Sequence, residues 1–177
     1  MSITPTMALM GGWWKVVGED PDWISDRRFT TLFPAAMIEQ MRTRARSRGR
    51  TTGMDSMLAS AGETVTRIVR GGGRVVAGTD SPIIPYGAAL VAEVENYVWG
   101  GLTEVEALKT ATSVPAAALA MQGEIGTLRG GALADMLIVD GNPLQDISDL
   151  RRARIVIKDG EVFSIEELMS PPRALIP

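Results

Sequence analysis

The sequence predicts an α/β fold in which a parallel strand pair with helical connections precedes a smaller region of short strands. Three observations support this class. The apolar run at residues 75–77 lies between three glycines and the turn residues Gly78-Thr79-Asp80, as buried strands do. Residues 3–10 form an earlier β-prone segment, and helical patterns separate the two. From Gly123 onward, glycines divide short apolar segments, which indicates a change of architecture.

The composition is that of a globular protein. The chain has 177 residues, 45% of them hydrophobic and 22% charged, enough for one domain or for one domain and part of another. A net charge of −3 provides no general attraction to nucleic acid or to an anionic membrane. No apolar stretch has the length of a membrane span and no signal peptide opens the chain. We therefore expect a cytoplasmic protein with neither nucleic acid nor membrane as a partner.

Two residue types are missing from the sequence, and this limits its chemistry. Without cysteine, the chain has no disulfide, no thiol nucleophile and no thiolate metal ligand. Without histidine, it lacks the commonest metal ligand and the usual general base near neutral pH. Any acid–base chemistry that this chain supports must therefore proceed without imidazole.

The first 40 residues are expected to begin with a strand and to continue through a loop into a helix. Pro5 suits the end of the strand at residues 3–10 better than its interior. Trp13 and Trp14 begin the loop, where they either pack in the interior or line a substrate pocket. Asp20-Pro21-Asp22 signals a turn. A helix begins near Ala35, and its buried face comprises Met37, Ile38 and Met41.

Five arginines recur at alternate positions toward the end of this helix, namely Arg42, Arg44, Arg46, Arg48 and Arg50. They form either a solvated helix end, where cations offset the helix dipole, or a patch for phosphate or nucleic acid. No aromatic residues are interleaved and the chain is acidic overall, which favours the helix end. After a connection rich in glycine and serine, residues 63–70 form a second helix that ends at the glycines 71–73 and turns inward Val65, Ile68 and Val69.

Helices and then short strands are expected after Asp80. Residues 87–99 form a helix, with apolar residues at helical spacing. Thr103 and Glu106 have the spacing of a capping box and open a short helix, and a further helix restarts at Ser113 and covers residues 116–121. A strand is expected at residues 134–140. Asp159-Gly160 predicts a hairpin between residues 154–158 and 161–164, and residues 171–177 are expected to form a surface extension.

Asp80 is the first candidate for chemistry because it directly follows the strand at residues 75–77. In parallel α/β folds the loops after the strands gather at one edge, and ligands bind there. An aspartate before Ser-Pro also caps loops, so the local sequence leaves a catalytic and a structural role open. Glu93 and Glu95 lie on the next helix and are interpreted as structural or solvated, not as catalytic.

The order of several motifs resembles the end of a metal-dependent amidohydrolase. Gly78-Thr79-Asp80 is followed by Gly101-Leu102-Thr103-Glu104-Val105-Glu106-Ala107-Leu108 and later by Gly126-Thr127-Leu128, Ala134-Asp135, Asp140-Gly141-Asn142-Pro143-Leu144 and Ile157-Lys158-Asp159-Gly160. The resemblance extends from about residue 72 to residue 163, and Ile3-Thr4-Pro5-Thr6 resembles the preceding barrel strand. Residues 11–50 match weakly. The resemblance is greatest to the branch with imidazolonepropionase-like hydrolases and prolidases, which act on carbon–nitrogen bonds.

This resemblance implies the C-terminal part of a (β/α)8 barrel at residues 1–122, with strands seven and eight, and part of a small β-sandwich at residues 123–177. It implies that Asp80 ends the eighth strand, ligates a divalent metal (zinc in the first place) and acts as general base for metal-bound water. The implied substrate of the complete enzyme is a small molecule with an amide or cyclic amide bond.

The sequence departs from the family pattern in its metal ligands. The family's histidines and its lysine or carboxylate on earlier strands have no counterpart here, and one carboxylate cannot hold zinc, which takes three or four protein ligands. We therefore expect the chain alone to bind no metal and to be inactive. It would be a hydrolase fragment that pairs with the missing N-terminal portion of the barrel or with itself. The alternative is a non-catalytic structural or interaction module derived from such a barrel.

Overall fold

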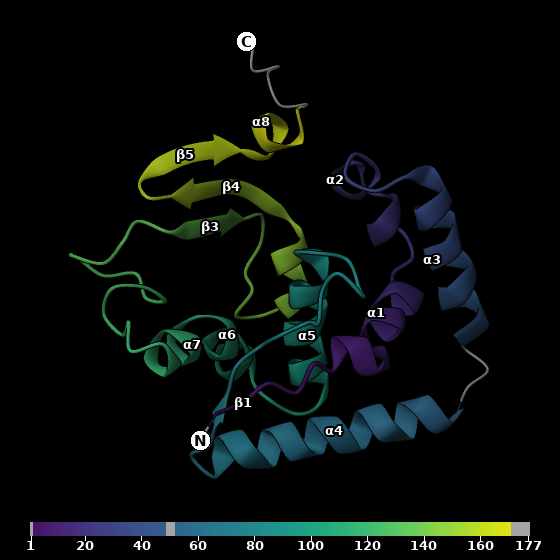
Figure 1. Cartoon of the computed structure of the whole chain (residues 1–177), viewed down its shortest axis with the longest axis horizontal. Coiled ribbons are helices and arrows are strands. Elements are labelled where there is room, and N and C mark those ends of the chain that lie inside the picture. Colours follow the sequence, from purple (N-terminus) through teal and green to yellow (C-terminus); the bar gives the residue numbers. More distant parts are fainter. Residues whose placement is uncertain (1, 49–51, 171–177) are drawn as a thin grey trace.

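The computed structural model describes residues 2–48 and 52–170. In this part of the chain, helices surround a central helix, α5 (Ala88–Trp99), and two small sheets lie on different sides of it (Figure 1). The first sheet pairs β1 with β2, and the second has the order β3-β4-β5. The mixed α/β class that the sequence predicts is therefore confirmed.

The N-terminal segment is more helical than its apolar pattern predicts. Strand β1 covers only Ser2–Ile3, and the chain then forms the π-helical segment η1 (Ala8–Gly12) and helix α1 (Trp13–Glu19). The expected strand at residues 3–10 is therefore wrong beyond Ile3, and the expected loop at Trp13-Trp14 is wrong as well. A short apolar run does not distinguish a buried strand from a buried helix, which explains both differences.

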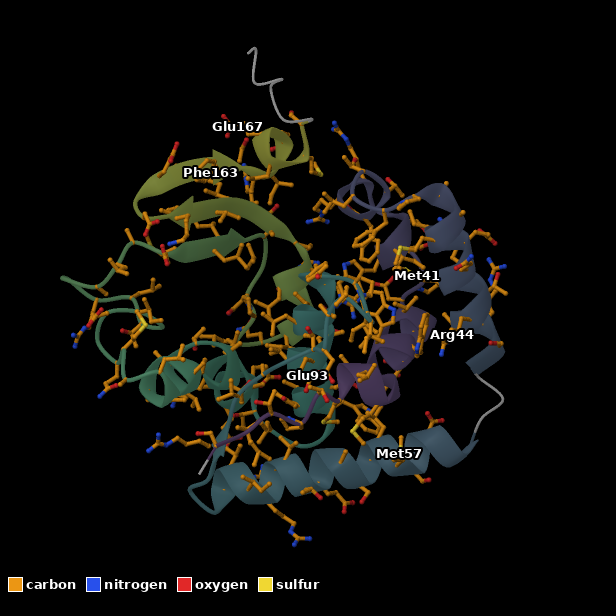
Figure 2. All side chains as sticks on the ribbon, viewed as in Figure 1. Met41, Arg44, Met57, Glu93, Phe163 and Glu167 are labelled. Carbon is orange, nitrogen blue, oxygen red and sulfur yellow. The ribbon has the colours of Figure 1, made fainter. Side chains whose placement is uncertain are left out.

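Two short helical segments, η2 (Trp23–Ser25) and α2 (Arg27–Thr30), lead to helix α3 (Ala35–Arg48), which begins where the sequence predicts. Ile38 and Met41 are buried as expected, and Figure 2 marks Met41 on this helix. The prediction for Met37 is wrong, because its side chain is 37% exposed. Met37 lies in the first turn of α3, where burial depends on neighbouring elements and not on spacing alone.

Helix α4 (Thr52–Arg70) begins earlier than predicted and includes the glycine- and serine-rich residues that were expected to form a connection. That expectation is wrong for a specific reason at Gly62. A Cβ atom there would lie 2.7 Å from the Cα atom of Gly100, so this glycine permits close helix packing and does not mark a loop. The inward face of α4 is confirmed, with Val65 buried. The helix ends at the predicted glycines, and Gly72 has a φ of 79°.

Strand β2 (Arg74–Val75) pairs in parallel with β1, which confirms the predicted order of strand, helical excursion and strand. The regular strand is shorter than the predicted residues 75–77. Val76 still donates its amide to the carbonyl of Ile3 (2.9 Å), whereas the amide of Ala77 turns to the carbonyl of Thr110 on helix α6 (2.9 Å). The strand therefore loses its regular pairing where a helix takes over its hydrogen bonds.

Three helices follow β2. Helix α5 occupies the predicted position, and α6 (Glu104–Ala111) begins at the predicted capping box. The amide of Thr103 donates to Oε2 of Glu106 (2.8 Å), and the amide of Glu106 donates to Oγ1 of Thr103 (3.2 Å). Helix α7 (Ser113–Ala118) ends earlier than expected. The predicted extension to Met121 is wrong, because Ala120 adopts a φ of 59°, which stops a right-handed helix.

The C-terminal region is an antiparallel sheet of β3 (Met136–Val139), β4 (Ala153–Lys158) and β5 (Glu161–Ser164). Its hairpin is confirmed: Asp159 and Gly160 have φ values of 53° and 83°, as a type I′ turn requires. Two elements lie outside the predicted set, the 3-10 helix η3 (Ile147–Arg151) and helix α8 (Ile165–Met169). The expected surface extension at residues 171–177 lies outside the described residues.

One face of this sheet is apolar and partly exposed within the described residues. The register places Met136 beside Ile157 and Ile157 beside Val162, while Ile138 lies beside Ile155. Because side chains alternate along a strand, these five residues share one face. Ile138 and Val162 are 45% and 60% exposed. Exposed apolar residues that lie together on one surface are typical of interaction sites, so this face has the character of an interface.

Helix α5 takes part in both hydrophobic cores. Ala89 and Ala92 belong to a core with the aromatic residues of the N-terminal segment, and Val94 and Tyr97 belong to a core between α4, β2 and α6. Because it contributes to both cores, α5 lies in the middle of the molecule (Figure 1). None of the described helices is long and apolar enough to cross a bilayer.

The two tryptophans at the start of α1 pack against other aromatic rings. The Trp13 ring is fully buried, 5.4 Å from that of Trp23 and 5.9 Å from that of Phe29. The packing interpretation is therefore confirmed for Trp13. Trp14 is partly buried and lies 4.6 Å below the guanidinium group of Arg44, which Figure 2 shows on α3.

The arginine run lies on α3 and, at its end, outside the described residues. Arg42 donates to Oγ of Ser25 (2.8 Å), and Arg44 covers the Trp14 ring. Arg46 is exposed at the predicted helix end, whereas Arg50 lies outside the described residues. Since two of these arginines bind groups of the same chain, the structure favours the helix-end interpretation over a phosphate patch.

Candidate functional site

The candidate site lies where the parallel strands β1 and β2 end. The register pairs Ile3 with Val75, and both chains continue past the regular strands as far as Thr6 and Gly78, where a Cβ atom on Gly78 would lie 3.9 Å from Cγ2 of Thr6. The two backbones approach closely at this point, because a Cβ atom on Gly78 would lie only 2.3 Å from Cγ2 of Thr4. Glycine is therefore required at position 78 to let the two strand ends lie side by side. The loop that carries Asp80 begins at this edge.

Asp80 lies in this loop with an exposed side chain and a φ of 53°. Among the described residues, its carboxylate makes no hydrogen bond and no ion pair. Its carbonyl accepts a hydrogen bond from the amide of Ile83 (3.1 Å), and the hydroxyls of Thr79 and Ser81 are 3.0 Å apart on either side. Non-glycine residues with positive φ concentrate at functional sites, although aspartate tolerates this region better than most. The geometry leaves both carboxylate oxygens available to a ligand.

The rest of the loop is anchored in the protein core. Ile84 and Pro85 are buried, whereas their neighbours Ile83 and Tyr86 are 72% and 67% exposed. The two buried residues anchor the backbone, while one aliphatic and one aromatic side chain of the same loop are exposed to solvent. The loop thus combines a rigid attachment with the polar and apolar groups that small-molecule sites use.

Glu93 on α5 lies in the interior of the molecule (Figure 2). Its carboxylate accepts hydrogen bonds from the backbone amides of Met7 (2.8 Å) and Ala8. Burial raises the pKa of Glu93, and the negative charge of Asp80 adds to this effect, whereas the Tyr97 hydroxyl and the two amides oppose it. The proximity of Asp80 to Glu93 therefore links the candidate loop to the buried carboxylate.

Tyr97 lies one helical turn after Glu93 and is fully buried. Its hydroxyl approaches Glu93, but it has no partner with full hydrogen-bond geometry among the described residues. Burial raises the pKa of Tyr97, and the charge of Glu93 raises it further. The tyrosine therefore stays neutral, and its hydroxyl faces Glu93 in the interior. Tyr97 is not exposed at the edge where Asp80 lies.

A second buried carboxylate on α5 has a structural role. Glu95 accepts from Nε of Arg151 (2.7 Å) and also from its Nη2 atom. The same guanidinium donates from Nη1 to Oδ2 of Asp20 (2.6 Å) and stacks over the ring of Trp23, 4.5 Å from its centroid. This arrangement joins η3 to α5 and to the turn after α1. From the sequence, Glu93 and Glu95 are expected to be either structural or solvated. Both are buried and hydrogen-bonded, so the structural interpretation is confirmed and the solvated one is wrong.

The sequence pattern did not reveal Arg151 as the partner of Glu95. The two residues are 56 positions apart, and η3 is not among the predicted elements. One signal was present in the sequence: two glutamates, Glu93 and Glu95, occur in an otherwise apolar helix. Charged residues in such a helix need partners when they are buried. The sequence therefore indicates that Glu93 and Glu95 need partners, but it does not show which residues these are.

The described residues do not by themselves form a cluster of ligands for a divalent metal. No three acidic residues of the described ranges lie together with the spacing of metal ligands. The oxygens of Glu93 are occupied by backbone amides, so Asp80 alone remains at the edge. Zinc takes three or four protein ligands. The donor set therefore does not fit a metal unless ligands come from outside this chain.

A separate surface depression lies along α3. It has a volume of about 500 Å³ and is lined by Ala36, Glu39, Gln40, Thr43, Arg44 and Ser47. All of these residues belong to one helix, and none belongs to the β1–β2 edge. Because it is open to solvent and brings together no groups from different elements, the depression lacks the character of an active site.

A parallel strand pair that ends beside an exposed carboxylate is an arrangement typical of α/β enzymes. Comparison with protein families makes this class specific. A family model described as the amidohydrolase family matches residues 30–163, which is most of the chain. The chain belongs to the amidohydrolase family. No curated protein sequence matches it.

Solved structures agree with this membership. A Xaa-Pro dipeptidase with methionine bound in its active site has a TM-score of 0.59 and 26% identity over 93% of this chain. A protein from Bifidobacterium longum assigned as a prolidase has a TM-score of 0.58 and 26% identity over 92% of this chain. A further amidohydrolase, at 22% identity and a TM-score of 0.54, shows the shared fold. The chain spans about a third of the length of these structures, namely 34%, 35% and 34%.

Proposed function

We propose that this chain is the C-terminal part of a metal-dependent hydrolase that cleaves amide or cyclic amide bonds in small molecules, and that it acts in the cytoplasm. Residues 1–122 would contribute strands seven and eight of a (β/α)8 barrel, and residues 123–177 would contribute part of a β-sandwich. The parallel β1–β2 pair and the separate β3-β4-β5 sheet support this division. The prolidase-like neighbours, which are about three times as long, support a role within a larger assembly.

Within this proposal, Asp80 is the catalytic residue of the chain. The observation that carries the assignment is an exposed carboxylate without a partner among the described residues, at the common end of two parallel strands. Such a carboxylate can accept the proton of an attacking water, which contributes about 10²-fold or more to a hydrolysis. It would also be one ligand of a divalent metal, most simply zinc, whose other ligands belong to the rest of the barrel.

The test uses the chain together with the remaining part of the family fold, in one polypeptide or as two. Hydrolysis of a Xaa-Pro dipeptide such as methionyl-proline is the assay, since the two similar structures at 26% identity are a Xaa-Pro dipeptidase and a protein assigned as a prolidase. Asp80→Asn keeps the shape of the side chain and removes its charge, so turnover should fall by about 10²-fold. Asp159→Asn is the matched control, because Asp159 has the same φ of 53° in the distant hairpin. Full turnover in Asp80→Asn would refute the assignment.

The alternative function is a non-catalytic structural or interaction module. It is favoured by the donor set, because the described residues include no cluster of three or more acidic side chains that could hold a metal. Elemental analysis of the chain alone should find no stoichiometric zinc under either proposal. Zinc and activity that appear only when the rest of the fold is added would support the hydrolase, whereas their continued absence would support the module.

A further inference from the structure

We propose that Glu93 is a positioning residue that caps the helical segment after β1 and thereby holds the end of β1 beside Asp80. That this edge is the reactive side rests on the proposed function. The capping itself follows from hydrogen bonds, burial and backbone geometry, and it can be tested without any activity.

The first step concerns the backbone after β1. Thr6 adopts a φ of 51°, although a β-branched residue strongly disfavours this region. The chain then enters the helical segment η1, which begins at Ala8, continues into α1 and has no capping side chain of its own. The amides at the start of a helix lack partners within it. A group from elsewhere must satisfy them when they are buried.

Glu93 is that group. The two oxygens of its carboxylate accept from the amides of Met7 (2.8 Å) and Ala8, which are 86 and 85 positions away in the sequence. Met7, Ala8 and Glu93 are all fully buried, so water cannot replace the carboxylate. The helix therefore receives from α5 the cap that its own sequence lacks, and the bend at Thr6 is held at the same time.

The second step links this cap to the candidate site. Thr6 lies beside Gly78, since a Cβ atom on Gly78 would be 3.9 Å from Cγ2 of Thr6, and Asp80 is only two residues further along the chain. The groups that act electrostatically on Glu93 are Tyr97 from its own helix and Asp80 from the loop after β2, while the β1 side contributes the two amides. Without the cap, the backbone at Thr6 would no longer be held at its positive φ, and the end of β1 would no longer be fixed beside the loop that carries Asp80.

Hydrogen exchange of the complete 177-residue chain, followed by NMR, tests the proposal. Glu93→Gln preserves the size of the side chain but replaces one acceptor with an amide donor that faces the backbone N–H groups. Exchange at Met7 and Ala8 should become about tenfold faster, the scale of one lost hydrogen bond to a carboxylate. Exchange at Val65 in α4 should not change.

Glu95→Gln is the matched control, because Glu95 is a buried glutamate on the same helix that binds Arg151 instead. It should leave exchange at Met7 and Ala8 unchanged. A pH series adds a readout that is specific to Glu93. Since burial raises its pKa, opening that exposes it should become easier as the pH rises through that pKa, and this dependence should vanish in Glu93→Gln.

Unchanged exchange at Met7 and Ala8 in Glu93→Gln would overturn the proposal, and so would an equal increase at Val65, which would show a general loss of stability. If Glu93→Gln does not fold, Glu93→Asp keeps a carboxylate that is one methylene shorter and should give the same local increase. Failure of both variants to fold would assign Glu93 to the core as a whole and overturn the positioning role. None of these outcomes depends on whether Asp80 is catalytic.

Discussion

Arg151 donates from Nε to Oε1 of Glu95 over 2.7 Å and so joins the segment before β4 to the central helix. Both side chains are almost fully buried, with 13% and 9% of their surfaces exposed. Arg151 also pairs with Asp20 (2.6 Å), so one guanidinium connects three parts of the chain. A buried ion pair of this kind fixes geometry, because either partner alone would be an uncompensated charge.

Arg151→Ala should lower the free energy of unfolding by about 3 kcal/mol, since it leaves the buried carboxylate of Glu95 without its partner. Urea denaturation followed by circular dichroism measures this change. Arg154→Ala is the control, because Arg154 pairs with Asp140 in solvent, with 69% and 60% of the side chains exposed. Its loss should cost less than about 1 kcal/mol. Equal effects of the two substitutions would contradict the structural role of Arg151.

Glu93 should produce a pH dependence of stability with a defined sign. Its pKa is raised above the ordinary value of 4.5, mainly by burial, so the folded protein binds this proton more strongly than the unfolded chain. Its contribution to stability is therefore complete below pH 4.5 and is lost as the pH rises through the raised pKa. In urea denaturation at a series of pH values, Glu93→Gln should lack this loss.

Asp135 offers a comparison of opposite sign. The amide of Asp159 and the ammonium group of Lys158 lower its pKa, so its contribution is present above its unfolded pKa and is lost as the pH falls. Asp135→Asn should therefore change how the free energy of unfolding falls at acidic pH. It should not change the loss of stability at higher pH that Glu93 causes. A Glu93→Gln curve that is parallel to the wild-type curve at every pH would show that Glu93 does not titrate differently on folding.

Two helical glycines should respond in opposite ways to alanine. Gly62→Ala would place a Cβ atom 2.7 Å from Cα of Gly100, so the helices α4 and α5 must separate, at a cost of about 1–3 kcal/mol. At Gly18 in α1, the nearest atom is the carbonyl oxygen of Ala45 at 3.7 Å, an ordinary contact. Gly18→Ala should therefore stabilise the protein by about 0.5–1 kcal/mol. Thermal unfolding of both variants tests this pair, and a destabilised Gly18→Ala would contradict it.

The isolated chain should self-associate at micromolar concentration. The strands β1 and β2 pair only with each other among the described residues, and Ile138 and Val162 are exposed on the apolar face of the second sheet. Unpaired edges and apolar faces favour contacts with another chain. Sedimentation velocity measures the association, and the double substitution Ile138→Lys/Val162→Lys should reduce it.

Leu137→Lys is the control for this association, because Leu137 is also half-exposed but points to the other face of β3. It should reduce association less than the double substitution. A wild-type chain that sediments as a compact monomer and unfolds cooperatively would show that it completes its own core. The proposal of a partial barrel would then have to be abandoned.

Interactions between near neighbours made several elements predictable from sequence alone. The two residues of the capping box, Thr103 and Glu106, are three positions apart, and the turn at Asp159-Gly160 needs only the positive φ that these residue types accept. Likewise, the glycines after α4 end that helix where they occur in the chain. The position of Asp80 after a strand is local too, because it depends on the end of one apolar run.

The tertiary structure decided which apolar and charged residues lie inside. The run after Ile3 is helical from Ala8 onward, and the amides of Met7 and Ala8 find their acceptor in Glu93 on α5, a partner that no pattern within the run contains. Glu93 and Glu95 could be buried because a backbone segment and Arg151, both distant in sequence, satisfy them. Gly62 in α4 packs closely against Gly100 at the end of α5, a contact that local sequence does not reveal. Buried polar groups and close backbone contacts depend on partners that only folding brings together. The sequence by itself indicated which residues would need such partners, but it did not show which residues the partners are.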